Sequence, residues 1–202
     1  MKRLLLSVSL ILFLNGPAWA QSGGGAVLPA TATPSGYSLA DMAEAMAYFS
    51  TSGNDPGLYP ATPFQILYIS ATNTFTVNTG TRFFVPVFFV DDSPPVLGDF
   101  PDGADDIAGY VFGSSELGAS CQIVVDGKAT TLDSAYAAGA HAPGLLDGGG
   151  SNFIQVGAFL TPLAKGTHTV TIQATFDGDV ILELTGGEPL TLEATYTVIV
   201  TD

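Results

Sequence analysis

The stretch Thr167-His168-Thr169-Val170-Thr171-Ile172-Gln173-Ala174-Thr175-Phe176 decides the fold of this chain. Its apolar side chains recur at every second position from Val170 to Phe176, with threonine or glutamine between them. Side chains of a β-strand point alternately to opposite faces of a sheet, so this pattern predicts a strand with one buried and one solvent-facing side. By the same alternation His168 shares the buried face, and we expect a packed, hydrogen-bonded histidine at the start of the strand. The segment from Leu190 to Val200 repeats the pattern.

Outward from these two segments, short apolar runs separated by clusters of Gly, Pro, Asn and Asp predict further strands. The expected strands are 64–70, 73–79, 82–90, 108–113, 121–126, 153–160, 167–176, 180–185 and 190–200. The run from Phe83 to Val90 is apolar on both faces, which predicts cover on both sides, and Pro86 within it predicts an edge position or a bulge. Many short strands without alternating helices favour an all-β fold, an antiparallel β-sandwich of the immunoglobulin-like or jelly-roll-like kind.

One N-terminal helix is expected before the strands, over about residues 38–50. Ser38 can cap it together with Asp41 three residues later, the spacing of a capping box. Apolar residues then recur at helical spacing and form one stripe, which predicts packing against the core. The stripe consists of Leu39, Met42, Met46 and Phe49.

The N-terminus has the pattern of a cleavable signal peptide over residues 1–20. Lys2 and Arg3 precede the apolar run 4–14, and Ala18-Trp19-Ala20 forms a small-x-small cleavage site. Residues 21–36 include three consecutive glycines and are expected to form a flexible leader. Residues 37–202 are expected to form a single β-sandwich domain. We therefore expect a secreted or periplasmic protein, and no membrane span in the mature chain.

The charge balance narrows the class of partner. Without residues 1–20 the chain keeps three basic residues against 19 acidic ones, a net charge of about −16. Nucleic acid and anionic membrane surfaces would repel such a protein, which leaves an extracellular protein, a glycan or cations as expected partners. The single cysteine, Cys121, cannot form an internal disulfide, and its apolar strand predicts a buried, inert thiol.

The loop between residues 91 and 106 is the strongest chemical candidate, because it holds six carboxylates. They are Asp91, Asp92, Asp99, Asp102, Asp105 and Asp106. Ca²⁺ prefers six to eight oxygen ligands, and extracellular modules bind it at roughly 10⁻⁴–10⁻³ M, so these residues are candidate ligands of a calcium-supported loop. Their spacing is not that of an EF-hand. A solvated acidic loop without a ligand is the alternative.

No catalytic motif stands out in the sequence, so the expected protein is a non-catalytic binding or structural module. Gly118-Ala119-Ser120-Cys121-Gln122 fails the G-x-S-x-G pattern of a serine nucleophile at its last position. His141 and His168 have no neighbouring His or Cys in the sequence, which makes a poor zinc site. Two alternatives remain, a secreted glycosidase-like hydrolase that uses the loop carboxylates and a subunit of a surface assembly.

Three short segments, taken in order, carry a resemblance to other proteins. They are Gly80-Thr81-Arg82-Phe83-Phe84-Val85-Pro86, Asp126-Gly127 and Pro162-Leu163-Ala164-Lys165-Gly166-Thr167-His168-Thr169-Val170. The chain resembles a group of uncharacterised secreted microbial proteins with a G-x-x-F-F-x-P strand, a D-G turn and a P-L-x-x-G-x-H-x-V strand start. Proteins of that group tend to carry tryptophans near the helix, where this chain has Met42, Met46 and Phe49. The resemblance implies secretion and a β fold, and it implies no functional residue.

Overall fold

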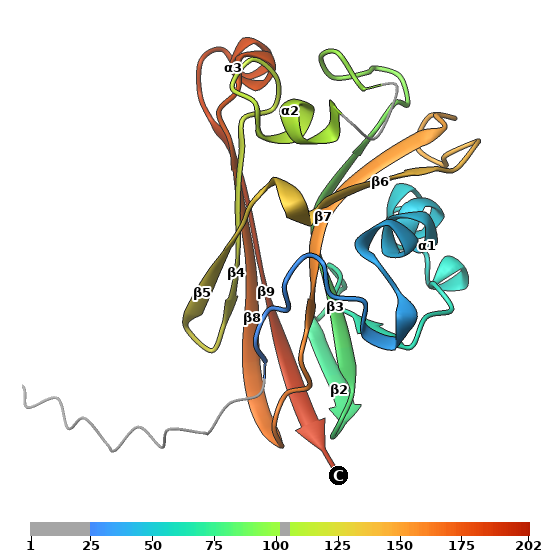
Figure 1. Cartoon of the computed structure of the whole chain (residues 1–202), viewed down its shortest axis with the longest axis vertical. Coiled ribbons are helices and arrows are strands. Elements are labelled where there is room, and N and C mark those ends of the chain that lie inside the picture. The colour runs from blue at the N-terminus through green and yellow to red at the C-terminus, as the bar shows by residue number, and fades with distance from the viewer. Residues whose placement is uncertain (1–24, 102–105) are drawn as a thin grey trace, which may run out of the picture.

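The computed structural model describes residues 25–101 and 106–202, and the predicted signal peptide lies outside them. In these residues nine strands form two sheets, which pack face to face (Figure 1). The first sheet has the order β1 (Phe64–Ile66), β3 (Arg82–Asp91), β7 (Asn152–Leu160), β6 (Ala137–His141). The second has the order β2 (Thr74–Asn78), β9 (Leu190–Thr201), β8 (Gly166–Phe176), β4 (Ala119–Val125), β5 (Lys128–Leu132). The expected all-β sandwich is confirmed, and its immunoglobulin-like or jelly-roll-like type stays a prediction.

Two strand pairs depart from the expected antiparallel arrangement. β1 runs parallel to β3 and β2 runs parallel to β9, because the chain crosses from the first sheet to the second and back between β1 and β3. Both added strands are short: β1 pairs with β3 only at 82–84, and β2 pairs with β9 only at 197–201. Among the described residues, no strand pairs with the remaining outer edges of β3 and β9. The sandwich is therefore open on this side.

Helix α1 (Leu39–Thr51) confirms the predicted helix and its cap. The Ser38 side chain accepts a hydrogen bond from the Asp41 amide, and the Asp41 carboxylate accepts one from the Ser38 amide. Met42, Met46 and Phe49 are buried against the outer face of the first sheet, beside β6 and β7 (Figure 1). This contact explains why β3 is apolar on both faces, since Phe84 faces α1 while its neighbours face the second sheet.

The strands predicted from clear patterns are present. In β8 the side chains from His168 to Phe176 alternate between buried and less buried, as expected. β3 carries an irregularity between Pro86 and Phe88, so the proline occupies a bulge. The described start of the predicted flexible leader is held against β7, because the Leu28 amide donates to the Phe159 carbonyl oxygen over 2.9 Å.

Two predicted strands are wrong. Residues 108–113 fall in helix α2 (Ile107–Phe112), and 180–185 fall in helix α3 (Asp179–Thr185). In α2 the buried side chains Ile107, Tyr110 and Val111 have helical spacing. α3 buries only Ile181 and ends at Gly186, whose positive φ of 77° is a common helix stop. Both helices lie at the end of the sandwich opposite the C-terminus (Figure 1).

Two strands and three short 3₁₀ helices that lie wholly within the described residues have no counterpart in the sequence-based prediction. β5 is mostly exposed and follows β4 through Asp126 and Gly127, both with positive φ, as in a tight hairpin turn. β6 consists mainly of alanine and glycine, which carry little β propensity. The 3₁₀ helices are η1 (Pro34–Gly36), η2 (Pro56–Leu58) and η4 (Ser134–Tyr136).

Candidate functional site

The predicted acidic loop begins where β3 ends. Asp91 is the last residue of β3, Asp92 follows it, Asp99 lies in the loop, and Asp106 precedes α2. Asp102 and Asp105 lie outside the described residues. Within residues 25–101 and 106–202, no three His, Cys, Asp or Glu side chains gather closely enough to hold a metal ion. The proposed set of ligands therefore stays a prediction, and the described aspartates have separate environments.

Asp92 fastens the loop to the start of β7. Its Oδ1 accepts hydrogen bonds from the backbone amides of Ser151 (2.6 Å) and Asn152 (2.8 Å), and its Oδ2 accepts one from Asn152 Nδ2 (2.7 Å). Burial raises the pKa of Asp92, but the hydrogen bonds from Asn152 and Ser151 outweigh burial and hold the pKa below its ordinary value. Asp92 is thus an ionised structural residue whose oxygens are already occupied.

Asp91 lies beside Asp147, a residue of the loop between β6 and β7. Burial raises the pKa of Asp91, the hydrogen bonds from Ser93 lower it in part, and the neighbouring Asp147 carboxyl raises it further. The Ser93 amide donates to Asp91 Oδ1 over 2.8 Å, and Ser93 Oγ donates to Asp147 Oδ1 over 3.0 Å. Two carboxyl groups from segments more than 50 residues apart in sequence therefore share one serine.

These groups line a pocket of about 290 Å³ between the two loops. Its walls are Phe89, Val90, Asp91, Ser93, Pro94, Pro95, Leu97 and Asp147. The pocket offers a carboxyl pair on an otherwise largely apolar wall. Such a pair can share a proton or bind a cation, because both arrangements relieve the repulsion between two close negative charges.

The glycines of the second loop allow this close approach. A Cβ added at Gly150 would lie 2.6 Å from the Ser93 amide nitrogen, and one at Gly148 would lie 2.8 Å from Ser93 Cβ. Real Cβ atoms essentially never come so close to other atoms. The glycines at 148–150 therefore allow the loop between β6 and β7 to pack closely against the acidic loop.

In the part of the chain that the structure describes, no Lys or Arg side chain lies at this end of the sandwich. Among the described residues, the Lys and Arg side chains lie toward the opposite end, because Arg82 begins β3, Lys165 precedes β8 and Lys128 begins β5. Arg82 instead contacts Ser35, and Lys165 contacts Asp202. Close to the pocket, Glu116 accepts a hydrogen bond from the Asp99 amide over 3.2 Å and adds a further negative charge.

Tyr110 holds the acidic loop in place through one hydrogen bond and one ring contact. Its hydroxyl donates to the Leu97 carbonyl oxygen over 2.8 Å, and its ring packs on Phe100 with ring centroids 5.2 Å apart. Burial raises the pKa of Tyr110 to about 12, and the charges of Glu116 and Asp91 add to the shift. The hydroxyl therefore stays protonated and remains a donor throughout the physiological range.

The remaining chemical candidates have structural roles. His168 is buried as predicted: its Nε2 donates to the Ala164 carbonyl oxygen over 2.8 Å, and its Nδ1 lies 2.7 Å from Asp126 Oδ2. Cys121 is buried, and burial raises the pKa of its thiol to about 12, which keeps it protonated and unreactive. His141 ends β6, and its Nδ1 lies 3.1 Å from Asn152 Oδ1.

Asp147 is absent from the functional residues that the sequence predicts, because no local pattern connects residue 147 with residue 91. The pairing of Asp91 with Phe153 in β3 and β7 brings the two loops together, and such long-range register is invisible in a single sequence.

Comparison with known protein families, curated proteins and solved structures finds no match for this chain. In the part of the chain that the structure describes, the helices are too short or too polar to cross a membrane.

Proposed function

We propose that this chain is a secreted, non-catalytic binding or structural module whose acidic end takes up a cation, with Ca²⁺ as the preferred ion. The observation that carries the proposal is the meeting of Asp91 and Asp147, two carboxyl groups from separate loops, at an end of the sandwich without a described Lys or Arg. The signal-peptide pattern of residues 1–20 supports secretion or export to the periplasm.

The chemistry of the pocket fits a weak, partly hydrated calcium site. Asp91, Asp147 and Ser93 supply oxygen ligands, and water would complete the six to eight that Ca²⁺ takes. With only two carboxylates, affinity in the range of extracellular modules, roughly 10⁻⁴–10⁻³ M, is expected. Binding would cross-link the loop after β3 to the loop before β7 and so stiffen this end for a protein or glycan partner.

The test is the thermal unfolding of the purified exported protein in EDTA and in 10 mM Ca²⁺. A ligand at 10 to 100 times its dissociation constant stabilises the folded state by about 1.4–2.7 kcal/mol, which corresponds to a rise of about 3–10 °C for a chain of this size. Asp147→Asn should abolish the rise. Glu188→Gln, which makes the same charge change at an exposed residue, should retain it. No rise with Ca²⁺, or an equal rise in all three proteins, contradicts the proposal.

A hydrolase is the alternative that one observation favours, since Asp91 has a raised pKa and lies in a pocket with an aromatic wall at Phe89. The closeness of the two carboxyls weighs against a glycosidase, which holds its pair about 5–10 Å apart. Turnover on a panel of glycan and ester substrates that is lost in Asp147→Asn would establish this alternative.

A subunit of a surface assembly is the other alternative, supported by the free edges of β3 and β9. Unpaired strand edges can add a strand from another copy or partner. Concentration-dependent association in sedimentation would favour this role, and a strict monomer over a wide concentration range would contradict self-assembly.

A further inference from the structure

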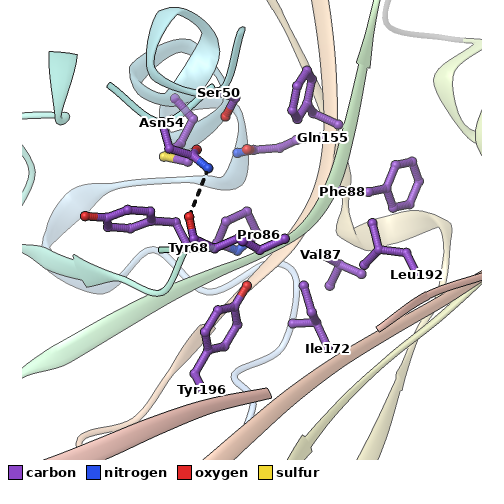
Figure 2. Close-up of a pocket in the computed structure, with 13 residues that line it drawn as sticks. Ser50, Asn54, Tyr68, Pro86, Val87, Phe88, Gln155, Ile172, Leu192 and Tyr196 are labelled. Atoms are coloured by element: carbon purple, nitrogen blue, oxygen red, sulfur yellow. Dashed lines mark hydrogen bonds between the residues drawn. The ribbon is translucent and has the colours of Figure 1, made fainter. Parts of the chain in front are cut away.

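A second pocket lies on the open side of the sandwich and shares Phe89, but neither carboxyl group, with the acidic pocket. It occupies about 170 Å³ and wraps around the free edge of β3 at the Pro86 bulge. α1 forms one wall through Met46 and Ser50, and β9 forms the opposite wall through Leu192 and Tyr196 (Figure 2). The pocket is therefore built from both sheets and from the helix.

The topology explains why the pocket exists. β1 ends at Ile66 and β2 meets β9 only from Thr197 onward, so neither short strand covers the part of the edge where Pro86 and Tyr196 lie. The bulge at Pro86 shifts the register of β3 against β7 and leaves space beside it. Ile69 and Phe89, at the pocket wall, keep 55% and 37% of their surface exposed, which makes an apolar rim.

Gln155 is the unusual residue of this pocket. It lies in the middle of β7, opposite Phe89 of β3, and only 2% of its surface is exposed. Within the described residues, neither Nε2 nor Oε1 of its amide has a hydrogen-bond partner. Figure 2 shows the amide directed toward α1, below Ser50 and above Pro86. Buried amides are almost always hydrogen-bonded, because burial without a partner is costly, so this side chain calls for a partner in the pocket.

We propose that this pocket binds a small neutral molecule that has an apolar ring or short chain and one group able to donate and accept a hydrogen bond, such as a carboxamide. The Gln155 amide nitrogen would donate a hydrogen bond to such a group, and the Gln155 amide oxygen would accept one from it. The apolar body would lie against Met46, Ile69 and Phe89, which line the pocket on the α1 side of the first sheet, where the Gln155 amide lies. The cavity volume resembles that of an engineered apolar cavity of about 150 Å³ that holds benzene, which sets the size of the ligand.

The lining excludes charged ligands. Among the residues that the structure describes, no Asp, Glu, His, Lys or Arg lines the pocket, so an ionised group would lose its hydration without gaining a counter-charge. The Tyr196 hydroxyl also points into the pocket (Figure 2). Burial raises the pKa of Tyr196 to about 12, so this hydroxyl is neutral at physiological pH. The site is thus independent of the cation proposed for the acidic end, and it can be tested with EDTA present.

The experiment measures binding of three probes of similar size to the full purified protein, by calorimetry and by NMR shifts of the Gln155 side-chain amide. Benzamide carries the required group, toluene lacks it and benzoate is charged. Two hydrogen bonds to the buried amide should make benzamide bind about tenfold or more tightly than toluene. Benzoate should not bind measurably at pH 7.

Two variants separate the pocket from general hydrophobic binding. Gln155→Leu keeps a similar volume without the amide and should reverse the preference, so that toluene binds more tightly than benzamide. Gln122→Leu, the same change on the outer face of β4, should leave both affinities unchanged. Ile69→Ala removes part of the apolar wall beside α1 with Gln155 intact and should weaken benzamide at least several-fold.

Three results would overturn the proposal. They are no benzamide binding at millimolar concentration to the wild-type protein, equal affinity for benzamide and toluene, or a benzamide preference that survives Gln155→Leu. Because Ile69→Ala leaves β7 untouched and changes a side chain that is 55% exposed, a fold defect in the first variant does not remove the test.

Discussion

Replacement of Gln155 by leucine should make this protein more stable, which is unusual for a change in a buried strand. The side chain is 2% exposed, and both polar atoms of its amide lack partners within the described residues. Burial of such a group costs about 1–3 kcal/mol. Leucine has a similar volume and opens no large cavity, so most of that cost should be recovered. For a chain of this size the gain corresponds to a rise of roughly 2–12 °C in the melting temperature.

The assay is urea unfolding followed by circular dichroism, with calorimetry as a second measure, in buffer without small-molecule additives. The midpoint should rise at an unchanged m-value. Gln122→Leu is the matched control: this glutamine contacts Gln173 on the outer face of the second sheet, and its loss should change the free energy of unfolding by about 0.5 kcal/mol or less. If Gln155→Leu is neutral or destabilising, the amide has a partner in the folded protein, and the reasoning on the pocket fails with it.

Further predictions concern two glycines, the packing of helix α1 and the hydrogen bonds of Asp92, and each is measured by urea or thermal unfolding. Gly178→Ala should lower the free energy of unfolding by about 3 kcal/mol or more, because the new Cβ would lie 2.6 Å from the Gly118 amide nitrogen. Gly109→Ala, which meets nothing within 4 Å, should instead raise it by about 0.5–1 kcal/mol, and equal effects would refute the argument from contact. Phe49→Ala should cost about 3–5 kcal/mol if α1 is an integral layer, and a loss below about 1 kcal/mol would make the helix peripheral. Asp92→Asn should lower stability at neutral pH by about 1 kcal/mol. Because the folded pKa of Asp92 is depressed, its contribution is present above the unfolded pKa and lost as the pH falls through the folded pKa, so the two proteins should converge in acid; a pH-independent difference would contradict this.

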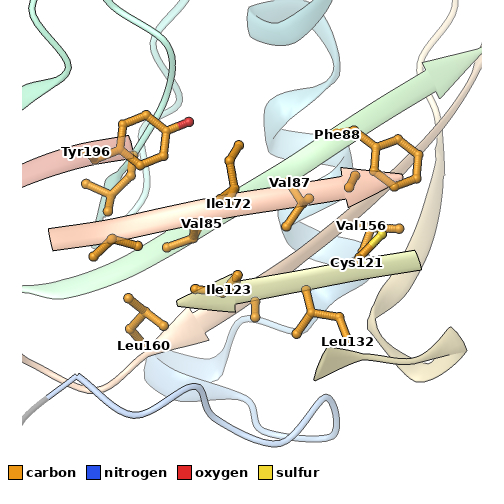
Figure 3. Close-up of a cluster of buried hydrophobic side chains, with 14 of the residues drawn as sticks. Val85, Val87, Phe88, Cys121, Ile123, Leu132, Val156, Leu160, Ile172 and Tyr196 are labelled. Carbon is orange, nitrogen blue, oxygen red and sulfur yellow. The ribbon is translucent and has the colours of Figure 1, made fainter. Parts of the chain in front are cut away.

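The parts of the fold that could be predicted are those whose burial differs between the two faces of one element. β8 and β9 alternate because one side meets the inter-sheet core and the other meets solvent. The core that they share with the first sheet includes Val85, Ile123, Val156 and Ile172 (Figure 3). α1 was predictable for the same reason, with a period of 3.6 in place of two.

The failures fall where local composition and burial disagree. Val180, Ile181 and Leu182 suit a strand by composition, yet only Ile181 is buried, and the segment forms the short helix α3. β5 and β6 gave no apolar signal, because β5 is a solvent-exposed edge strand and β6 packs through alanine and glycine. The position of these segments in the fold, and not their intrinsic propensity, determines their secondary structure.

The acidic site shows the same division. The sequence identified Asp91 and Asp92 as chemically important, but their partners Asp147 and Asn152 are about 55 to 60 residues away. Only the register of β3 on β7 brings them together. A single sequence shows where charges are dense along the chain. It does not show which carboxylates from different loops lie close together in the fold.

Gln155 is a polar residue at a position where the fold itself requires none. In β7 every residue from Phe153 to Leu160 is buried, since α1 covers one face of the strand and the second sheet covers the other. A leucine at this position would satisfy the strand, the helix contact and the hydrophobic pattern together, so folding alone gives no reason for an amide there. Residues that break a local rule at a cost in stability concentrate at functional sites, where the cost is offset when a ligand binds. A ligand that satisfies the amide should therefore stabilise the wild-type protein more than Gln155→Leu, and at saturation the gap in melting temperature between the two should narrow.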